Sequence, residues 1–214
     1  MKENKNPLEI NREYSERCIQ KINQYSSLPP FLKDYSHKKI TIVDLGCGGG
    51  QLIFTLKREN PGSEIIGIDI SPKRINNLKI KFPKDAFFCQ DVCETKLKKN
   101  CCDLVCCTQV IEHLEEDVKL IEEINRILKK KGFAFITSVI KEPWAVYKYI
   151  NRHKQFVLDP THEREYKNQK DFNMMFMNKF EIIKSRTYPV YRHFLSLKIK
   201  IPGYYIIESL FQKK

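Results

Sequence analysis

Short runs of β-branched and other apolar residues alternate with helical stretches through the middle of this chain. The expected strands cover residues 39–44, 64–69, 86–90, 103–108 and 132–139, and the expected helices cover residues 50–58, 72–81 and 115–129. Strands and helices at this spacing form βαβ units with right-handed crossovers and a parallel sheet. Ligands of such sheets bind at the carboxyl ends of the strands.

The pattern changes after residue 140. A helix is expected over residues 168–177 and a strand over residues 180–188. Residues 195–201 then alternate apolar and polar side chains, which is typical of a half-exposed strand that pairs antiparallel with the preceding one. We therefore expect an α/β fold with a Rossmann-like, seven-stranded and mostly parallel sheet, helices on both faces, and strands six and seven antiparallel.

The length of 214 residues fits one domain, and 42% hydrophobic residues are enough for a buried core. The prolines of Leu28-Pro29-Pro30 separate an N-terminal helical segment, residues 1–30, from a domain over residues 31–214. Inside that domain, residues 141–166 are typical of an irregular insertion, with a short helix expected from Trp144 to Ile150. We expect a small cap over about residues 140–177.

No run approaches the roughly 18 apolar residues of a membrane span, and the N-terminus lacks the apolar stretch of a signal peptide. A cytoplasmic location is therefore expected. The chain has eight cysteines, but Cys101–Cys102 and Cys106–Cys107 flank an expected buried strand. Because adjacent side chains of a strand point to opposite faces, we expect free thiols rather than zinc ligands or disulfides.

The formal net charge is +12, and it is unevenly distributed. Residues 1–128 carry 20 basic and 19 acidic side chains, whereas residues 129–214 carry 18 and 7. The excess of 11 positive charges in the second part favours an anionic partner such as RNA, a phosphorylated metabolite or a membrane surface. A lysine-rich solvated face is the alternative.

A glycine-rich turn follows the first expected strand, in the segment Asp44-Leu45-Gly46-Cys47-Gly48-Gly49-Gly50. Glycines there allow a tight turn and a close approach to a bound molecule. The spacing is G-x-G-x-G rather than the G-x-G-x-x-G of dinucleotide sites. Asp44 would repel a pyrophosphate, but it suits a cationic amino-acid group.

Two more carboxylates follow the next expected strands. Asp69 closes the second strand, where a carboxylate can accept both hydroxyl groups of a ribose. Asp91 follows the third strand and lies within reach of an adenine amine. Three carboxylates at successive strand ends, beside a glycine turn, predict a site for S-adenosylmethionine.

From about Ile40 to Val139 the chain resembles a class I S-adenosylmethionine-dependent methyltransferase. The resemblance rests on the glycine turn, on residues 67–71, 90–92 and 108–114, and on the turn at residues 126–132. It implies that Asp44 and Gly46 lie near the methionine moiety, Asp69 binds the ribose, Asp91 and Val92 flank the adenine, and Gln109 lines the cofactor and acceptor mouth. The expected cofactor-binding residues are Asp44, Gly46, Cys47, Gly48, Gly50, Asp69, Ile70, Asp91, Val92 and Gln109.

Glu112 and His113 lie in a segment similar to the Glu-x-x-Glu-His metal motif of the small-RNA 3′-terminal 2′-O-methyltransferases. Here the first position is Gln109, a neutral and poorer ligand for a hard divalent cation. Glu112, His113 and a later histidine, His153 or His162, could still form an incomplete metal site. Because similar segments occur in metal-free methyltransferases of small molecules, we expect no metal.

His113 and His162 are the expected catalytic residues. Residues 159–166 resemble a loop that caps the acceptor site in the metal-free relatives, and His162 could take a proton from an acceptor hydroxyl. A structural histidine that anchors the loop is the alternative. Aromatic and basic residues also interleave over residues 144–154, as on a surface for nucleic acid or ring substrates, or in a cap packed through its aromatics.

The expected function is methyl transfer from S-adenosylmethionine to an oxygen, nitrogen or carbon atom of a small-molecule acceptor, anionic or lipid-like in character. The alternative acceptor is RNA, with ribose 2′-O-methylation as an example. A third reading is a non-catalytic partner of a methyltransferase subunit, which the intact site motifs disfavour. The basic C-terminal part could also contact a membrane surface.

Overall fold

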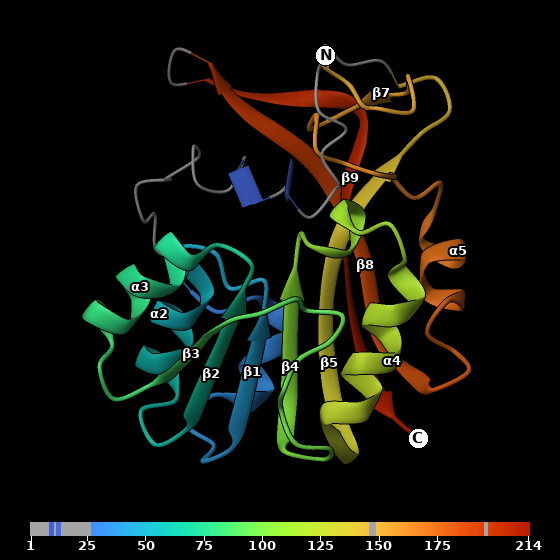
Figure 1. Ribbon diagram of the computed structural model, residues 1–214. Coiled ribbons are helices and arrows are strands. Elements are labelled where there is room, and N and C mark those ends of the chain that lie inside the picture. Colours follow the sequence, from blue (N-terminus) through green and yellow to red (C-terminus); the bar gives the residue numbers. More distant parts are fainter. Residues whose placement is uncertain (1–8, 11, 14–26, 146–148, 195–196) are drawn as a thin grey trace.

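The computed structural model describes residues 9–10, 12–13, 27–145, 149–194 and 197–214. Its main feature is one seven-stranded sheet with the strand order β3-β2-β1-β4-β5-β9-β8 (Figure 1). The strands of this sheet are β1 (Thr41–Leu45), β2 (Glu64–Asp69), β3 (Ala86–Cys89), β4 (Cys102–Thr108), β5 (Leu128–Lys141), β8 (Phe180–Phe194) and β9 (Leu197–Lys213). The remaining elements are η1 (Pro30–Tyr35), α2 (Gln51–Glu59), α3 (Pro72–Lys81), η2 (Ile111–His113), α4 (Asp117–Ile127), β6 (Tyr149–Ile150), β7 (Phe156–Val157) and α5 (Gln169–Met174).

The first five strands pair in parallel, and β9 pairs antiparallel with both β5 and β8. The expected seven-stranded sheet, in which the sixth and seventh strands along the chain pair antiparallel with each other, is therefore confirmed. β8 consequently runs in the same direction as β1 to β5. Because the parallel strands share one direction, their carboxyl ends meet at one edge of the sheet.

Two apolar layers cover the two faces of the sheet. One core packs α4 and α5 against the strands, with side chains such as Ile124 and Phe172 fully buried. The other core holds η1, α2 and α3 through residues such as Leu32, Ile53 and Leu78. The apolar spacing of these helices places one stripe against the sheet, as for amphipathic helices on an open α/β sheet.

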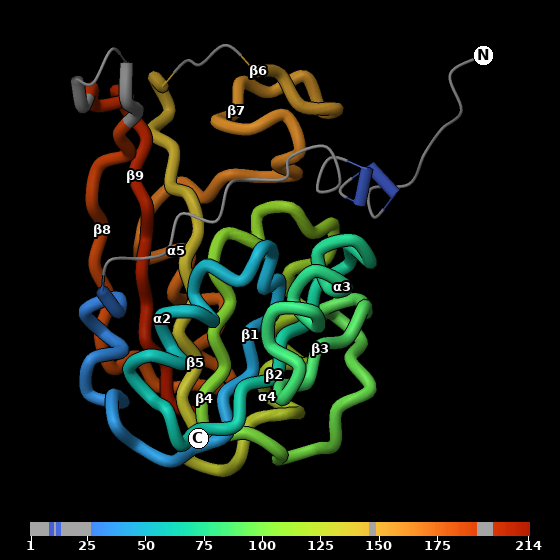
Figure 2. The backbone as a smooth tube through the Cα atoms, turned by 90° about the vertical axis from the view of Figure 1, so that its left-hand side faces the viewer, coloured from blue at the N-terminus to red at the C-terminus, as the bar shows by residue number. Residues whose placement is uncertain are grey.

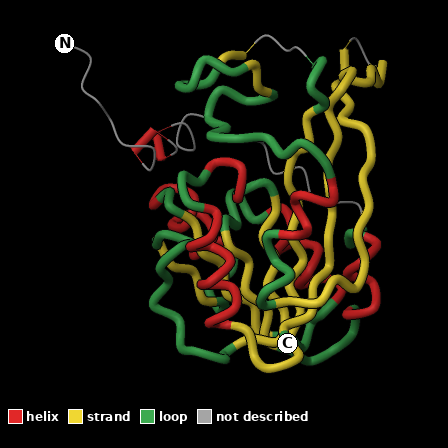
Figure 3. The backbone as a smooth tube through the Cα atoms, turned by 90° about the vertical axis from the view of Figure 1, so that its right-hand side faces the viewer, coloured by secondary structure: helices red, strands yellow, loops and turns green. Residues whose placement is uncertain are grey.

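Beyond the carboxyl ends of the strands lies a second, smaller layer. The β6–β7 hairpin and the outer end of the β8–β9 pair both lie at this end of the molecule (Figure 2). Loops gather beneath them, between the hairpin and the main sheet (Figure 3). Gly203 of β9 fits tightly there, because an added Cβ would lie 2.4 Å from the Cβ of Ala145.

Several local expectations differ from the structure or lie outside it. The helix expected over residues 144–150 is wrong in its described part, since Trp144 lies in a turn and Tyr149–Ile150 form β6. This segment forms a short hairpin instead, in which Ile150 of β6 pairs with Phe156 of β7. β5 begins at Leu128, four residues earlier than expected. Most of the expected N-terminal helix lies outside the described residues.

None of the helices in the described part of the chain is both long and apolar enough to cross a membrane.

Candidate functional site at the carboxyl edge of the sheet

The glycine turn connects β1 to α2 at the carboxyl edge of the sheet. Gly46, Gly48 and Gly50 have φ angles of 74°, 54° and 83°, in the left-handed region that favours glycine. An added Cβ at Gly46 would lie 2.3 Å from Cγ2 of Val110, and one at Gly50 would lie 2.4 Å from Cδ2 of Leu78. Both the backbone shape and the packing therefore require glycine at these two positions.

Asp44 lies just before this turn, in the buried part of β1. Its side chain is 1% exposed, and its Oδ1 has no hydrogen-bond partner among the residues that the structure describes. Burial, with the nearby charge of Asp69, raises the pKa of Asp44 to about 8. A buried carboxyl oxygen without a partner costs free energy, so it is suited to receive a cationic or hydrogen-bond-donating group of a ligand.

Asp69 ends β2 next to the same turn. Its Oδ2 accepts the N–H of Gly48 at 2.9 Å, and its Oδ1 accepts the N–H of Ser71 at 2.9 Å. Arg74 lies 4.0 Å from the carboxylate. Since an ionised carboxylate has about four lone-pair positions, two bonds leave room for hydroxyl groups of a ligand.

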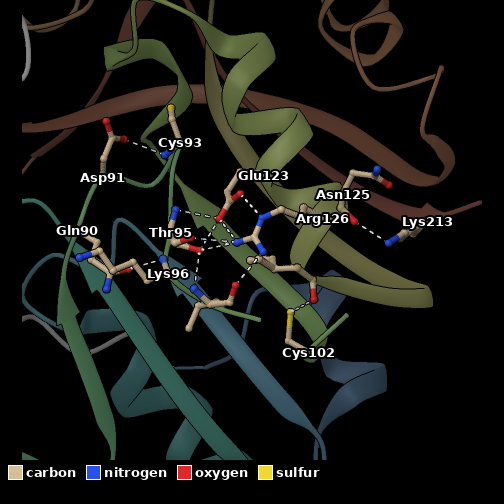
Figure 4. A network of polar contacts seen from close by, with 12 residues as sticks. Gln90, Asp91, Cys93, Thr95, Lys96, Cys102, Glu123, Asn125, Arg126 and Lys213 are labelled. Carbon is tan, nitrogen blue, oxygen red and sulfur yellow. Dashed lines mark hydrogen bonds and ion pairs between the residues drawn. The ribbon is translucent and has the colours of Figure 1, made fainter. Parts of the chain in front are cut away.

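Asp91 and Val92 follow β3. The Oδ1 of Asp91 accepts the N–H of Cys93 at 2.8 Å, and Val92 is buried in the core beside α4. The loop continues to Thr95, whose N–H and hydroxyl both bond to the carboxylate of Glu123 on α4 (Figure 4). Arg126 bonds to the same carboxylate and to the carbonyl oxygen of Leu97 at 2.8 Å, so the loop is fixed to α4.

The other expected cofactor residues lie at the same edge. Cys47 is buried in the turn, and burial raises the pKa of its thiol well above its ordinary value. Ile70 directly follows β2 and is half-buried. Gln109 directly follows β4, is exposed and has a φ angle of 56°. Its backbone N–H donates to the carbonyl oxygen of Thr137 at 3.1 Å.

A second group of polar side chains lies beyond the ends of β4 and β5. Glu112 and His113 of η2 and His162 of a later loop place one ligand-type atom each within 4.8 Å of one another. The rings of His113 and His162 meet edge to face, with centroids 4.8 Å apart. Among the described residues, no other group of three or more His, Cys, Asp or Glu side chains has ligand atoms close enough to hold a metal ion. Our expectation that no metal binds there stays a prediction.

The loop of residues 159–166 is held from two sides. The N–H groups of Glu163 and Arg164 donate to the carbonyl oxygen of Glu112, and Tyr166 exchanges backbone hydrogen bonds with Val139 and Lys141 of β5. His162 is therefore brought next to η2 by backbone contacts, although 49 positions separate it from His113 in the sequence.

The environment gives the two histidines opposite proton affinities. Burial, with the neighbouring His162, lowers the pKa of His113 to about 4. Burial alone would lower the pKa of His162, but its hydrogen bond to Glu165 and the charges of Glu112, Glu165 and Asp159 outweigh this effect and raise it. His162 is thus the better proton acceptor of the two near neutral pH.

Sequence reasoning missed Glu165 and Ser138. Glu165 bonds to His162 at 2.7 Å, and the hydroxyl of Ser138 donates to Glu112 at 2.9 Å. The one available signal for Glu165 was its place three residues after His162, which carries little information in an irregular loop.

Residues 43–136 match the family model of a methyltransferase domain. This match and the shared fold agree with the resemblance to class I S-adenosylmethionine-dependent methyltransferases that the motifs predicted. S-adenosylmethionine is the methyl donor of that family.

Two curated relatives show the range of acceptors among similar proteins. A ubiquinone biosynthesis O-methyltransferase of Pelagibacter ubique is 31% identical over 147 residues, covering 64% of this chain and 55% of the relative. A tRNA U34 carboxymethyltransferase of Campylobacter jejuni is 28% identical over 145 residues, covering 64% and 48%. The chain spans about half the length of these curated relatives.

A solved structure of a SAM-dependent methyltransferase from Methanosarcina mazei aligns with a TM-score of 0.67 over 87% of this chain and 98% of the other. Its sequence is 16% identical, so the likeness shows a shared fold.

The residues at the carboxyl edge fit S-adenosylmethionine. The unpartnered Oδ1 of Asp44 suits the ammonium group of its methionine part, and the glycines let the backbone of the turn lie close to a bound molecule. The free lone pairs of Asp69 suit hydroxyl groups of a ribose.

Proposed function

We propose that this protein is an S-adenosylmethionine-dependent methyltransferase that acts on a small-molecule acceptor. The observation that carries the proposal is Asp44, a buried carboxyl group with an unpartnered oxygen beside a turn whose left-handed φ angles favour glycine. The sulfonium of the cofactor supplies an activated methyl group, so correct placement of the acceptor accounts for much of the rate.

In this proposal each strand end has one task. Asp44 and the turn residues Gly46, Cys47, Gly48 and Gly50 hold the methionine part, and Asp69 with Ile70 holds the ribose. Asp91 and Val92 flank the adenine, and Gln109 lines the mouth toward the acceptor. His162 accepts a proton from the acceptor, and His113, which is neutral near pH 7, lies beside it as a hydrogen-bonding group.

The acceptor side is formed by the second layer. The proposed domain covers residues 31–214, with the N-terminal segment of residues 1–30 and a cap over about residues 140–177. Exposed apolar side chains such as Trp144, Ile150 and Phe156 lie in that cap, which supports an acceptor with an apolar or lipid-like part. Contact with a membrane surface through the basic C-terminal part belongs to the same proposal.

A cytoplasmic location is also proposed. Every cysteine in the described part of the chain is a free thiol, which is typical of a reducing compartment.

RNA is the second candidate acceptor. The excess of 11 positive charges in residues 129–214 favours it, and one relative is named for an action on tRNA. The position of His162 in the small cap, next to Glu112 and His113 of η2, supports the small molecule more strongly.

The test is to incubate the purified protein with methyl-labelled S-adenosylmethionine and a total cell extract, and then to count label in RNA, protein, lipid and small-molecule fractions. Label in the small-molecule or lipid fraction is expected. Label in RNA that is lost steeply with rising salt would replace the first candidate by the second.

A further inference from the structure

Glu165 is a buried carboxyl group that directly contacts His162. Its side chain is 2% exposed, and that of His162 is 5% exposed. The Oε1 of Glu165 lies 2.7 Å from Nδ1 of His162 and 2.6 Å from the backbone nitrogen of Leu158. Two close partners on one oxygen fix the direction of the carboxyl group.

This contact determines which ring nitrogen of His162 carries the proton. The carboxylate of Glu165 has no hydrogen to donate, so its Oε1 accepts from the N–H of Leu158 and from Nδ1 of His162. In the neutral ring the other nitrogen, Nε2, then keeps its lone pair. Nε2 is therefore the atom that can accept a proton from a bound molecule.

Glu112, which faces His162 from η2, has an unsatisfied carboxyl oxygen. Glu112 is fully buried, its Oε2 accepts the hydroxyl of Ser138, and its Oε1 has no partner among the described residues. Its position near His162 suits a ligand group that donates a hydrogen bond. A hydroxyl group has such a donor hydrogen, and it loses it when the oxygen becomes methylated.

We propose that Glu165 is a positioning residue that holds His162 with Nε2 free to deprotonate an acceptor hydroxyl group. The inference rests on the proposed function and narrows it to O-methylation. In the step, the O–H bond of the acceptor breaks and an N–H bond forms on Nε2. The electron pair of that oxygen forms the bond to the methyl group, and the electrons of the broken S–CH₃ bond stay on sulfur.

The imidazolium that results is stabilised from both sides. Glu165 and Asp159 face it from its own loop, and Glu112 and the neutral His113 face it from η2. The proton leaves to solvent when the products dissociate.

The first readout is the His162 ring itself, which needs neither cofactor nor acceptor. Long-range ¹H–¹⁵N NMR spectra of the whole protein identify the tautomer, with the spectrum of His162→Gln assigning the signals. We expect the Nδ1–H tautomer in the wild type, and in Glu165→Gln a titration of His162 shifted to lower pH. An Nε2–H tautomer in the wild type, or an unchanged titration in the variant, would overturn the proposal.

The second readout is the pH dependence of methyl transfer to the cell-extract fraction that takes up label. In Glu165→Gln we expect the acidic limb of the rate profile to move to lower pH. We expect the rate on the plateau to fall by about 10-fold, which is less than the loss of about 100-fold or more expected when a general base is removed. Binding of S-adenosylmethionine should be unchanged. An unshifted limb would contradict the role of Glu165.

Glu163→Gln is the matched control, because Glu163 lies in the same loop but bonds to Arg152 and His153. Its profile should match the wild type. If the wild-type protein binds no S-adenosylmethionine while the tautomer is as expected, the proposed function fails and the geometric claim for Glu165 stands.

Discussion

Asp44 is the residue at which function and stability are expected to conflict. The folded protein prefers its protonated form, since burial and Asp69 raise its pKa to about 8. Between about pH 4 and pH 8 the unfolded chain therefore loses a proton that the folded protein keeps. The free energy of unfolding should fall as pH rises through this window.

Asp44→Asn should therefore stabilise the protein at pH 7.5 and leave it nearly unchanged at pH 4.5. One pKa unit corresponds to about 1.4 kcal/mol, so a gain of a few kcal/mol is the upper range. Each kcal/mol raises the melting temperature by about 2–4 °C in a domain of this size. Thermal melts at both pH values measure the effect, and an equal or lower melting temperature at pH 7.5 would contradict it.

At the level of single residues, the sequence was informative where strands end. Asp44, Asp69 and Asp91 were predicted at one edge because parallel strands share their direction, and the structure places them there. Glu165 and Ser138 were not predicted, because their contacts depend on how one irregular loop packs on η2 and β5. Periodicity does not encode such packing.

At the level of elements, helix α4 supports the loop that follows β3. Arg126 bonds to Glu123, whose side chain is only 6% exposed, and to carbonyl oxygens of Thr95 and Leu97 (Figure 4). This network lies between α4 and the loop that begins with Asp91. It fixes the expected adenine side of the site without contributing a residue to it.

Arg126→Ala should lower the free energy of unfolding by about 2 kcal/mol or more, because Glu123 then loses a charged hydrogen-bond partner in the interior. We also expect weaker binding of S-adenosylmethionine, measured by calorimetry. Lys119→Ala on the same helix is the control, since its ion pair with Glu116 is exposed and screened by solvent, so little change is expected. Equal stability and affinity in both variants would refute the supporting role of Arg126.

The elements themselves differ in how predictable they were. α2, α3 and α4 begin and end within about two residues of the expected bounds because their apolar stripes have a clear helical period. The helix expected from Trp144 was wrong, since Trp144 lies in a turn and Tyr149 belongs to β6, which pairs with the equally short β7. Strands of only two residues are too short to show a detectable period in the sequence.

At the scale of the whole molecule, the sheet separates two tasks. The parts that hold the proposed cofactor come from β1 to β4, within the residues that match the methyltransferase family model. The proposed acceptor side comes mainly from the chain after β5, which also carries the excess positive charge. Motifs therefore predicted the cofactor, whereas the acceptor depends on loops and a hairpin that the motifs do not describe.

The central claim is that the carboxyl edge of the sheet binds S-adenosylmethionine. Its most direct test is calorimetric titration of the whole protein with S-adenosylmethionine, for the wild type and for Asp69→Ala. We predict saturable binding with one site in the wild type and loss of that binding in the variant. No binding to the wild type, or undiminished affinity in Asp69→Ala, would contradict the account.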